Sequence, residues 1–275
     1  ITNNTVKANS TGGIYYSASN YATIINNIVT ENGGVGIRSS STPLVITNNT
    51  ITGNSSSGIS ASYNSLTITN NIISGNTTTS GGGGIRCYHI SSSTVISNNT
   101  ILKNATTSYG GGGIYCGQCS PMITNNTIRD NSAHQGGGVY CDASSSPMIM
   151  NNMILGNYAS EGGGVYCISN STPTIANNTI IANWAYYGSG IFSGSSSLNI
   201  TNNTIVGNVT GTITYGVTYG VIFCSQSSPA ITNNIVAYNS SGIYKSGSTG
   251  TPVLRHNNVY GNTDYNYSGL AAGSG

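Results

Sequence analysis

Residues 136–157 read GGGVYCDASSSPMIMNNMILGN, and the rest of the chain repeats this stretch with small changes. The alternation Val-Tyr-Cys at residues 139–141 predicts a strand whose Val and Cys face inward and whose Tyr faces outward. We expect residues 148–150 and 153–155 to form a second and a third short strand. No segment between these strands is long enough for a helix, so the unit predicts one coil of a parallel β-helix.

The most regular element of the repeat is an Asn-Asn pair between apolar residues. Its copies follow one another at intervals of 22 to 31 residues, which is the signature of a solenoid. The pair begins at Asn3, Asn26, Asn48, Asn70, Asn98, Asn125, Asn151, Asn177, Asn202 and Asn233, and His256-Asn257 takes its place in an eleventh copy. We therefore expect a single all-β domain over residues 1–275, with about eleven coils and three short strands per coil.

Proline and glycine support this register independently. Each proline precedes an Asn-Asn position by four residues, or by five in one copy, as expected for a residue without an N–H at a turn or strand start. These residues are Pro43, Pro121, Pro147, Pro173, Pro229 and Pro252. The glycine runs also share one column, where the backbone is expected to take positive φ or to pack closely. They span residues 81–84, 110–113, 136–138 and 162–164.

Two recurring motifs resemble those of a known family. Ile-Thr-Asn-Asn-Thr-Ile occurs at residues 46–51, 123–128 and 200–205, and Gly-Gly-Gly-[Ile/Val]-Tyr-Cys at 111–116, 136–141 and 162–167. In these motifs the chain resembles the right-handed parallel β-helix repeat family, the pectin-lyase-like solenoids. The resemblance implies the fold over essentially the whole chain. It leaves the activity open, because the family includes pectate lyases, polygalacturonases, phage tailspikes, adhesins and secreted proteins.

The last copy resembles the final coil of large secreted surface proteins. The pattern Asn-Asn-Val-Tyr-Gly-Asn-x-x-x-Asn-Tyr-Ser-Gly at residues 257–269 carries this resemblance. In such proteins sequence normally continues further, so both ends are expected to continue into a longer chain.

Composition excludes several functions. Charged residues are 4% of the chain and the net charge is +2, which is too little to hold a nucleic-acid backbone. No apolar stretch reaches 18 residues, so no membrane span is expected. A surface rich in Ser, Thr and Asn favours an extracellular or cell-surface location.

The acidic residues do not form a recognisable catalytic set. The resemblance implies either clustered Asp residues for glycoside hydrolysis, or Asp-bound calcium with an Arg or Lys base for lyase chemistry. Hydrolysis by two carboxylates needs groups ~5–9.5 Å apart. We expect Asp142 and Glu161 to be over ~20 Å apart along extended chain, and Asp130 to form a surface ion pair with Lys103. No catalytic, cofactor-binding or metal-binding residue is predicted.

The Asn pairs are expected to be structural. Amide side chains at a bend can bond to the next amide along the stack, as in the Asn ladders of stacked β structures. Several first residues of the pairs also begin an Asn-x-Thr sequence. As inward ladder residues we expect them to be poor glycan acceptors, and Asn170 and Asn266 to be better ones. The first residues of pairs that begin Asn-x-Thr are Asn48, Asn98, Asn125, Asn177 and Asn202.

Five of the six cysteines share the inward column after the glycine run. They are Cys87, Cys116, Cys141, Cys167 and Cys224. A buried stack of thiols that act as small hydrophobes is favoured. The Cys116-Gly-Gln-Cys119 sequence has redox-motif spacing without a helix N-terminus, so it predicts either a local disulfide or two free thiols.

An aromatic column is expected on the outer face of the same strand. It is preceded by Arg86, which is placed for a cation–π contact with Tyr115. The column contains Tyr115, Tyr140, Tyr166, Phe192, Phe223 and Tyr244. One interpretation is stacking between neighbouring strands. The other is an exposed strip, with Arg86 beside it, for a saccharide or a partner chain; the resemblance also places a substrate groove on this strand.

Three functions remain open at this stage. The first is a non-catalytic structural component of a cell surface or filament, in contact with further copies of itself end to end or laterally. The second is a module that binds polysaccharide along the aromatic column. The third is part of a carbohydrate-active lyase or hydrolase whose missing acids lie in flanking sequence.

Overall fold

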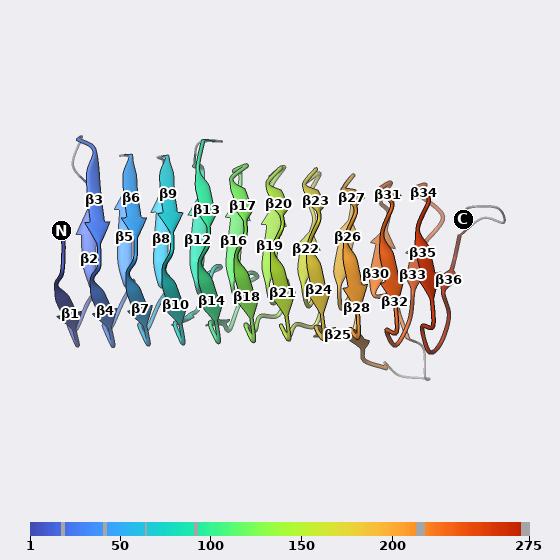
Figure 1. Cartoon of the computed structure of the whole chain (residues 1–275), viewed down its shortest axis with the longest axis horizontal. Coiled ribbons are helices and arrows are strands. Elements are labelled where there is room, and N and C mark those ends of the chain that lie inside the picture. The colour runs from blue at the N-terminus through green and yellow to red at the C-terminus, as the bar shows by residue number, and fades with distance from the viewer. Residues whose placement is uncertain (18–19, 41–42, 64, 91–92, 213–217, 271–275) are drawn as a thin grey trace.

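The computed structural model describes residues 1–17, 20–40, 43–63, 65–90, 93–212 and 218–270. The chain winds into a parallel β-solenoid, with the N-terminal coil at one end of the stack and the C-terminal coil at the other (Figure 1). The coils build three long sheets of eleven, ten and eleven strands, to which a complete coil contributes one strand each, and all elements in the described part of the chain are strands. The predicted all-β solenoid with three short strands per coil is confirmed.

Sheet 1 contains the strand that follows each glycine run. Its eleven strands are β2 (Ile14–Tyr16), β5 (Ile37–Ser40), β8 (Ile59–Ser62), β12 (Ile85–Tyr88), β16 (Ile114–Gly117), β19 (Val139–Asp142), β22 (Val165–Cys167), β26 (Ile191–Gly194), β30 (Ile222–Ser225), β33 (Ile243–Ser246) and β36 (Tyr267–Ser268).

Sheet 2 contains the strand that precedes each Asn-Asn pair. Its ten strands are β3 (Ala22–Ile25), β6 (Leu44–Thr47), β9 (Leu66–Thr69), β13 (Val95–Ser97), β17 (Met122–Thr124), β20 (Met148–Met150), β23 (Thr174–Ala176), β27 (Asn199–Thr201), β31 (Ala230–Thr232) and β34 (Val253–Arg255). Each of the six prolines directly precedes a strand of sheet 2, so the predicted proline positions are confirmed.

Sheet 3 contains the strand that follows each pair. Its eleven strands are β1 (Thr5–Lys7), β4 (Ile28–Thr30), β7 (Thr50–Thr52), β10 (Ile72–Ser74), β14 (Thr100–Leu102), β18 (Thr127–Arg129), β21 (Met153–Leu155), β24 (Thr179–Ile181), β28 (Thr204–Val206), β32 (Ile235–Ala237) and β35 (Asn258–Tyr260). Two further pairs form in longer loops between sheets 3 and 1: β11 (Thr77–Thr78) with β15 (Ala105–Thr106), and β25 (Trp184–Ala185) with β29 (Val209–Thr210).

The core is a set of vertical columns of apolar side chains. In sheet 3, Ile101 pairs with Ile128 and Ile128 with Ile154, and all three are fully buried. Full burial of one such side chain stabilises the fold by roughly 1.5–3 kcal/mol. The columns repeat through every sheet, so the apolar core extends along the whole stack.

The glycine run combines the two roles expected from the sequence. Gly136 has a φ of +64°, which a residue without a Cβ adopts without strain. A Cβ on Gly138 would lie 2.5 Å from the carbonyl oxygen of Gly164 in the next coil. The run therefore lets the backbone turn into sheet 1 while successive coils stay in contact.

Candidate functional site

The second Asn of each pair forms a continuous ladder inside the solenoid. Nδ2 of Asn126 donates to Oδ1 of Asn152 at 3.0 Å and to the carbonyl oxygens of Ile96 at 2.9 Å and Thr124 at 3.0 Å. The backbone N–H of Asn126 donates to the same Oδ1 at 2.9 Å. Asn126 is almost fully buried, so these bonds replace the water that its amide loses on folding. The predicted Asn ladder is confirmed.

The first Asn of each pair does not belong to the ladder. Asn125 is exposed and has a φ of +56°, and Asn48 is likewise exposed with a φ of +57°. Asn tolerates this left-handed conformation better than most residues, and here the bend turns its side chain outward. The expectation that Asn48, Asn98, Asn125, Asn177 and Asn202 point inward is therefore wrong, and burial gives no reason to call them poor glycan acceptors.

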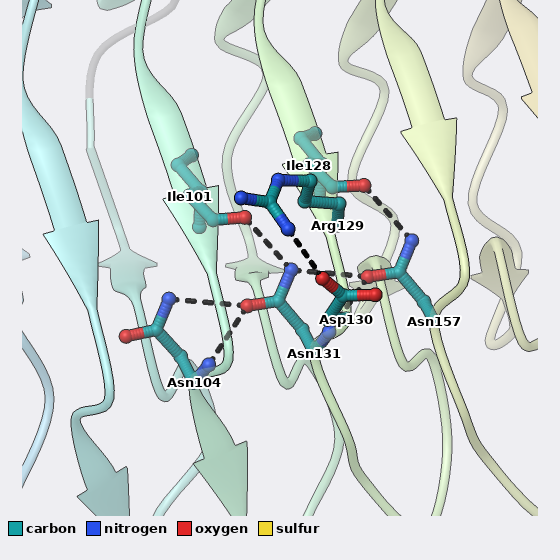
Figure 2. Close-up of polar contacts among 7 residues, drawn as sticks. All are labelled: Ile101, Asn104, Ile128, Arg129, Asp130, Asn131 and Asn157. Carbon is teal, nitrogen blue, oxygen red and sulfur yellow. Dashed lines mark hydrogen bonds and ion pairs between the residues drawn. The ribbon is translucent and has the colours of Figure 1, made fainter.

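A second ladder runs parallel to the first and was missed by the sequence analysis. Nδ2 of Asn131 donates to Oδ1 of Asn157 at 3.0 Å, and Asn104 donates to Asn131 at 3.1 Å (Figure 2). In every coil its Asn lies five residues after the second Asn of the pair. This constant spacing in the sequence is the signal from which the second ladder could have been predicted. It fixes the start of the loop between sheets 3 and 1.

The aromatic column has the predicted register but not the predicted exposure. Tyr115 pairs with Tyr140, and Tyr140 with Tyr166, in adjacent strands of sheet 1. Tyr166 is 1% exposed and Tyr140 9%, and Phe192 and Phe223 are also buried. The expectation of an exposed strip is wrong for these four rings. They form a second apolar cluster on the outer face of sheet 1.

The rings stack on one another along the solenoid axis. The ring centroids of Tyr115 and Tyr140 are 5.3 Å apart, and those of Tyr140 and Tyr166 are 5.2 Å apart, with interplanar angles of 12° and 17°. Phe223 and Tyr244 continue the stack at 5.5 Å and 4°. Each inner ring therefore has its faces occupied by neighbours, and these faces are what a sugar ring would stack against.

Loops between sheets 3 and 1 cover the column. A Cβ on Gly110 would lie 2.1 Å from Cδ2 of Tyr140, so this loop rests directly on the ring. Tyr187 and Tyr219 come from later loops and pack against the same cluster. These loops are longer in the coils whose pairs begin at Asn70 to Asn202, where the interval to the next pair is 25 to 31 residues instead of 22 or 23. The longer loop explains why an outward ring becomes buried.

Polar groups hold the loops onto Tyr166. Nε2 of Gln135 donates to the phenol oxygen of Tyr166 at 3.0 Å and to Oε2 of Glu161 at 2.8 Å. Burial, together with the charge and hydrogen bond of Glu161, raises the pKa of Tyr166 far above its ordinary range. Tyr166 is therefore a neutral phenol at physiological pH, suited to fastening the loop and not to accepting a proton.

Asp142 and Glu161 both act on the charge balance of the aromatic column. Both carboxylates raise the pKa of Tyr140 and of Tyr166 by charge repulsion, which weakens with distance. The expected separation of over ~20 Å between the two carboxylates stays a prediction. Oδ1 of Asp142 accepts the N–H of Ala143 at 2.6 Å. Both carboxylates thus have structural partners.

Arg86 makes the contact that the sequence predicts, whereas Asp130 does not. The guanidinium carbon of Arg86 lies 5.9 Å from the ring centroid of Tyr115, as expected, and 5.1 Å from that of Tyr88. Asp130 pairs with Arg129 of its own coil at 2.6 Å, so the predicted pair with Lys103 is wrong. The adjacent Arg129 reaches the carboxylate directly, as Figure 2 shows.

All six cysteines are buried and free. Cys87, Cys116, Cys141 and Cys167 occupy consecutive strands of sheet 1 in register, which confirms the thiol stack. Sγ of Cys119 donates to the carbonyl oxygen of Cys87 at 3.6 Å. Of the two alternatives for the Cys116–Cys119 pair, the structure has the free thiols.

The described residues contain neither a metal-binding cluster nor a membrane-spanning helix. No group of three or more His, Cys, Asp or Glu side chains there could hold a metal ion. No helix of that part of the chain is long and apolar enough to cross a membrane.

The sequence matches the family described as the right handed beta helix region, over residues 1–101 and 97–218. The chain belongs to this family, so the solenoid described above is a right-handed parallel β-helix. No curated protein matches the chain. The family defines the fold, and the function has to be argued from the side chains.

Proposed function

We propose that the chain is a non-catalytic structural solenoid of an extracellular or cell-surface protein, which associates with further copies of itself. The observation that carries this proposal is the pair of Asn ladders. Two amides in each coil make coil-to-coil bonds, from Asn4 to Asn257 in one ladder and from Asn9 to Asn262 in the other. A chain that devotes its most regular residues to holding coils together is suited to be a rigid rod.

The ladders supply stability that does not depend on charge. A neutral hydrogen bond contributes about 0.5–1.5 kcal/mol net, and each ladder Asn makes several. Only two ion pairs join the described residues, Lys7–Glu31 and Arg129–Asp130, and exposed pairs contribute about 0–1 kcal/mol. Such a rod keeps its shape over a wide range of salt, which suits a surface component.

The outer face of sheet 3 is the surface that we propose for lateral contact. Four apolar side chains of one column are exposed on it: Ile28, Ile72, Met153 and Ile235. They alternate mainly with Thr, so the face is flat and uncharged along this column. An uncharged column that exposes large apolar side chains in four coils is suited to a protein–protein contact.

Sedimentation velocity over a range of protein concentrations tests the proposal. We expect concentration-dependent association that Met153→Lys reduces at least tenfold. Met148→Lys is the matched control, because Met148 lies in the same coil on sheet 2 and is 43% exposed against 46% for Met153. A strictly monomeric chain, or equal effects of the two variants, would contradict lateral contact through sheet 3.

Polysaccharide binding is the second candidate function. A cluster of aromatic rings outside the sheet 1 column favours it. The ring centroids of Tyr158 and Trp184 are 4.5 Å apart at 3°, and Tyr186 meets Trp184 edge-on at 4.8 Å. Tyr158 is 52% exposed, unlike the buried rings of sheet 1. We expect Tyr158→Ala to weaken retention on a glycan array if this function holds, with Tyr109→Ala as an exposed aromatic control. Unchanged retention would remove these rings from consideration.

Catalysis on a carbohydrate is the third candidate function. It can be tested directly by an assay of product release. A structural solenoid predicts no release of reducing sugar or unsaturated uronate by the purified chain. Release that Glu161→Gln or Asp142→Asn abolishes would replace the structural proposal with catalysis at the Tyr166 cluster.

A further inference from the structure

A cavity of about 730 Å³ opens beside the first two coils. Its lining comes from the corner before β2, from the corresponding corner before β5, and from two side chains on the outer face of sheet 1. The lining residues are Thr11–Tyr15, Gly33–Val35 and Arg38.

The equivalent corner in later coils is filled by a ring. A Cβ on Gly81 would lie 2.7 Å from the ring of Tyr115, and one on Gly110 would lie 2.1 Å from that of Tyr140. In the register of sheet 1, the same column reads Arg38 in β5 and Ser60 in β8. The space that a phenol ring occupies farther along the solenoid is therefore left open here.

The cavity carries an unpaired positive charge. Arg38 is exposed, and neither of the ion pairs among the described residues involves its guanidinium. A guanidinium matches a carboxylate in a planar, two-bond geometry. The free charge thus selects for an anion.

An aromatic ring stands beside that charge. Tyr15 pairs with Arg38 across β2 and β5 and is 66% exposed. Hydrogen bonds with Ser40 and Ser17, and then the charge of Arg38, lower the pKa of its phenol. Offset stacking of two rings adds to the stabilisation that area burial gives. Tyr15 thus selects for a flat ring.

We propose that this cavity binds a small aromatic carboxylic acid, with its ring against Tyr15 and its carboxylate on the guanidinium of Arg38. The ligand takes the place that the protein's own phenol rings take in later coils. This assignment is independent of the structural role proposed above. It predicts that an uncharged phenol or a non-planar carboxylic acid binds more weakly than an aromatic one.

Isothermal titration of the whole chain with 4-hydroxybenzoate tests the proposal. We expect saturable binding with one site per chain. Arg38→Gln should weaken it at least tenfold, whereas Arg255→Gln removes an equal exposed charge on sheet 2 and should leave it unchanged. Tyr15→Ala should weaken binding several-fold and Tyr15→Phe should restore it. All four substitutions lie at exposed side chains, and unchanged thermal unfolding shows that the fold is intact.

Three further probes define the ligand chemistry. Phenol, which lacks the carboxylate, and cyclohexanecarboxylate, which lacks the flat ring, should each bind at least tenfold more weakly than 4-hydroxybenzoate. Absence of binding by 4-hydroxybenzoate, or equal binding by Arg38→Gln, would overturn the assignment. Tighter binding of glucuronate than of 4-hydroxybenzoate would also overturn it and would assign the cavity to sugar acids.

Discussion

The side-chain amide of Asn131 is bonded on both sides, because Nδ2 donates to Oδ1 of Asn157 at 3.0 Å while its own Oδ1 accepts from Asn104 at 3.1 Å. The second Nδ2 hydrogen is directed to the carbonyl oxygen of Ile101, also at 3.0 Å. Asn131 is fully buried, so any substitution leaves polar groups of two neighbouring coils without a partner.

Replacement of one ladder amide by a carboxyl group should make stability depend on pH. Nδ2 of Asn157 donates to Oδ1 of Asn183 at 3.0 Å and to the carbonyl oxygen of Ile128 at 2.9 Å. In Asn157→Asp a carboxylate would face both acceptors, whereas the protonated acid can still donate to one. Burial and these acceptors should therefore raise the pKa of the introduced group in the folded state above ~3.9.

The direction of the effect follows from that raised pKa. The stability of Asn157→Asp should be highest below about pH 4, where both states hold the proton, and should fall as pH rises through the folded-state pKa. Urea unfolding at pH 4 and pH 8 measures it, with the unsubstituted chain as the control. A variant equally stable at both pH values would show that the amide protons are not needed at this position.

The buried aromatic column should behave as core. Tyr166→Ala removes a ring that is 1% exposed and should cost about 3–5 kcal/mol of unfolding free energy. Tyr166→Phe keeps the ring, as Phe192 does in the next coil, and should cost about 1 kcal/mol for the lost bonds to Gln135 and Glu161. Tyr21→Ala, at an exposed position, is the control and should cost less than ~0.5 kcal/mol. Equal losses for Tyr166→Ala and Tyr21→Ala would argue that the column is open to solvent.

Alkaline pH should destabilise the solenoid. Burial raises the pKa of the Cys224 thiol to about 12, and burial followed by the charge of Asp142 raises that of Tyr115 to about 12. The unfolded chain loses these protons from about pH 8.5 for thiols and about pH 10 for phenols. The folded state holds more protons in this window, so the free energy of unfolding should fall from about pH 8.5 to pH 12.

Two variants identify the groups that make the free energy of unfolding fall with rising pH. Cys224→Ala and Tyr115→Phe should each make the decline shallower, although Cys224→Ala also lowers stability at neutral pH. Chemical unfolding at half-unit steps from pH 8 to pH 11 measures the slope. A slope that neither variant alters would mean that other groups release the protons.

The thiols should be inert in the folded protein. All six are buried. A hydrogen bond with a neighbouring thiol, followed by burial, raises the pKa of Cys116 and Cys141, and burial raises that of Cys87. Since the thiolate is the reactive form, an aromatic disulfide reagent at pH 8 should titrate fewer than one thiol per chain before unfolding and six after it. Rapid reaction of two native thiols would indicate that the Cys116–Cys119 turn opens to solvent.

Periodicity made the fold predictable from sequence. Asn pairs, prolines and glycine runs recur at fixed positions in the repeat, and each marks a bend, a strand start or a close coil contact. The register of sheet 1 also followed, because Cys116 and Cys141 occupy the same position in successive repeats.

Exposure and bend geometry were not predictable in the same way. Strand alternation places Tyr140 outside the coil, but only the path of the loop that contains Gly110 decides whether solvent reaches the ring. Within each pair the two asparagines are chemically identical, and the left-handed φ of Asn125 decides that Asn126 is the one facing inward. Loop paths and single dihedral angles have no periodic signal in the sequence.

A comparison of urea unfolding between Asn126→Ala and Asn125→Gly is the decisive measurement for the view that ladder amides hold the coils together. Asn126→Ala removes the side-chain bonds to Asn152, Ile96 and Thr124, and should cost at least ~3 kcal/mol. Asn125→Gly removes an exposed amide at a φ of +56° that Gly readily adopts, and should stay within ~1 kcal/mol of the unsubstituted chain. Equal losses in the two variants, or an Asn126→Ala protein as stable as the original, would contradict the ladder as the source of the rod's stability.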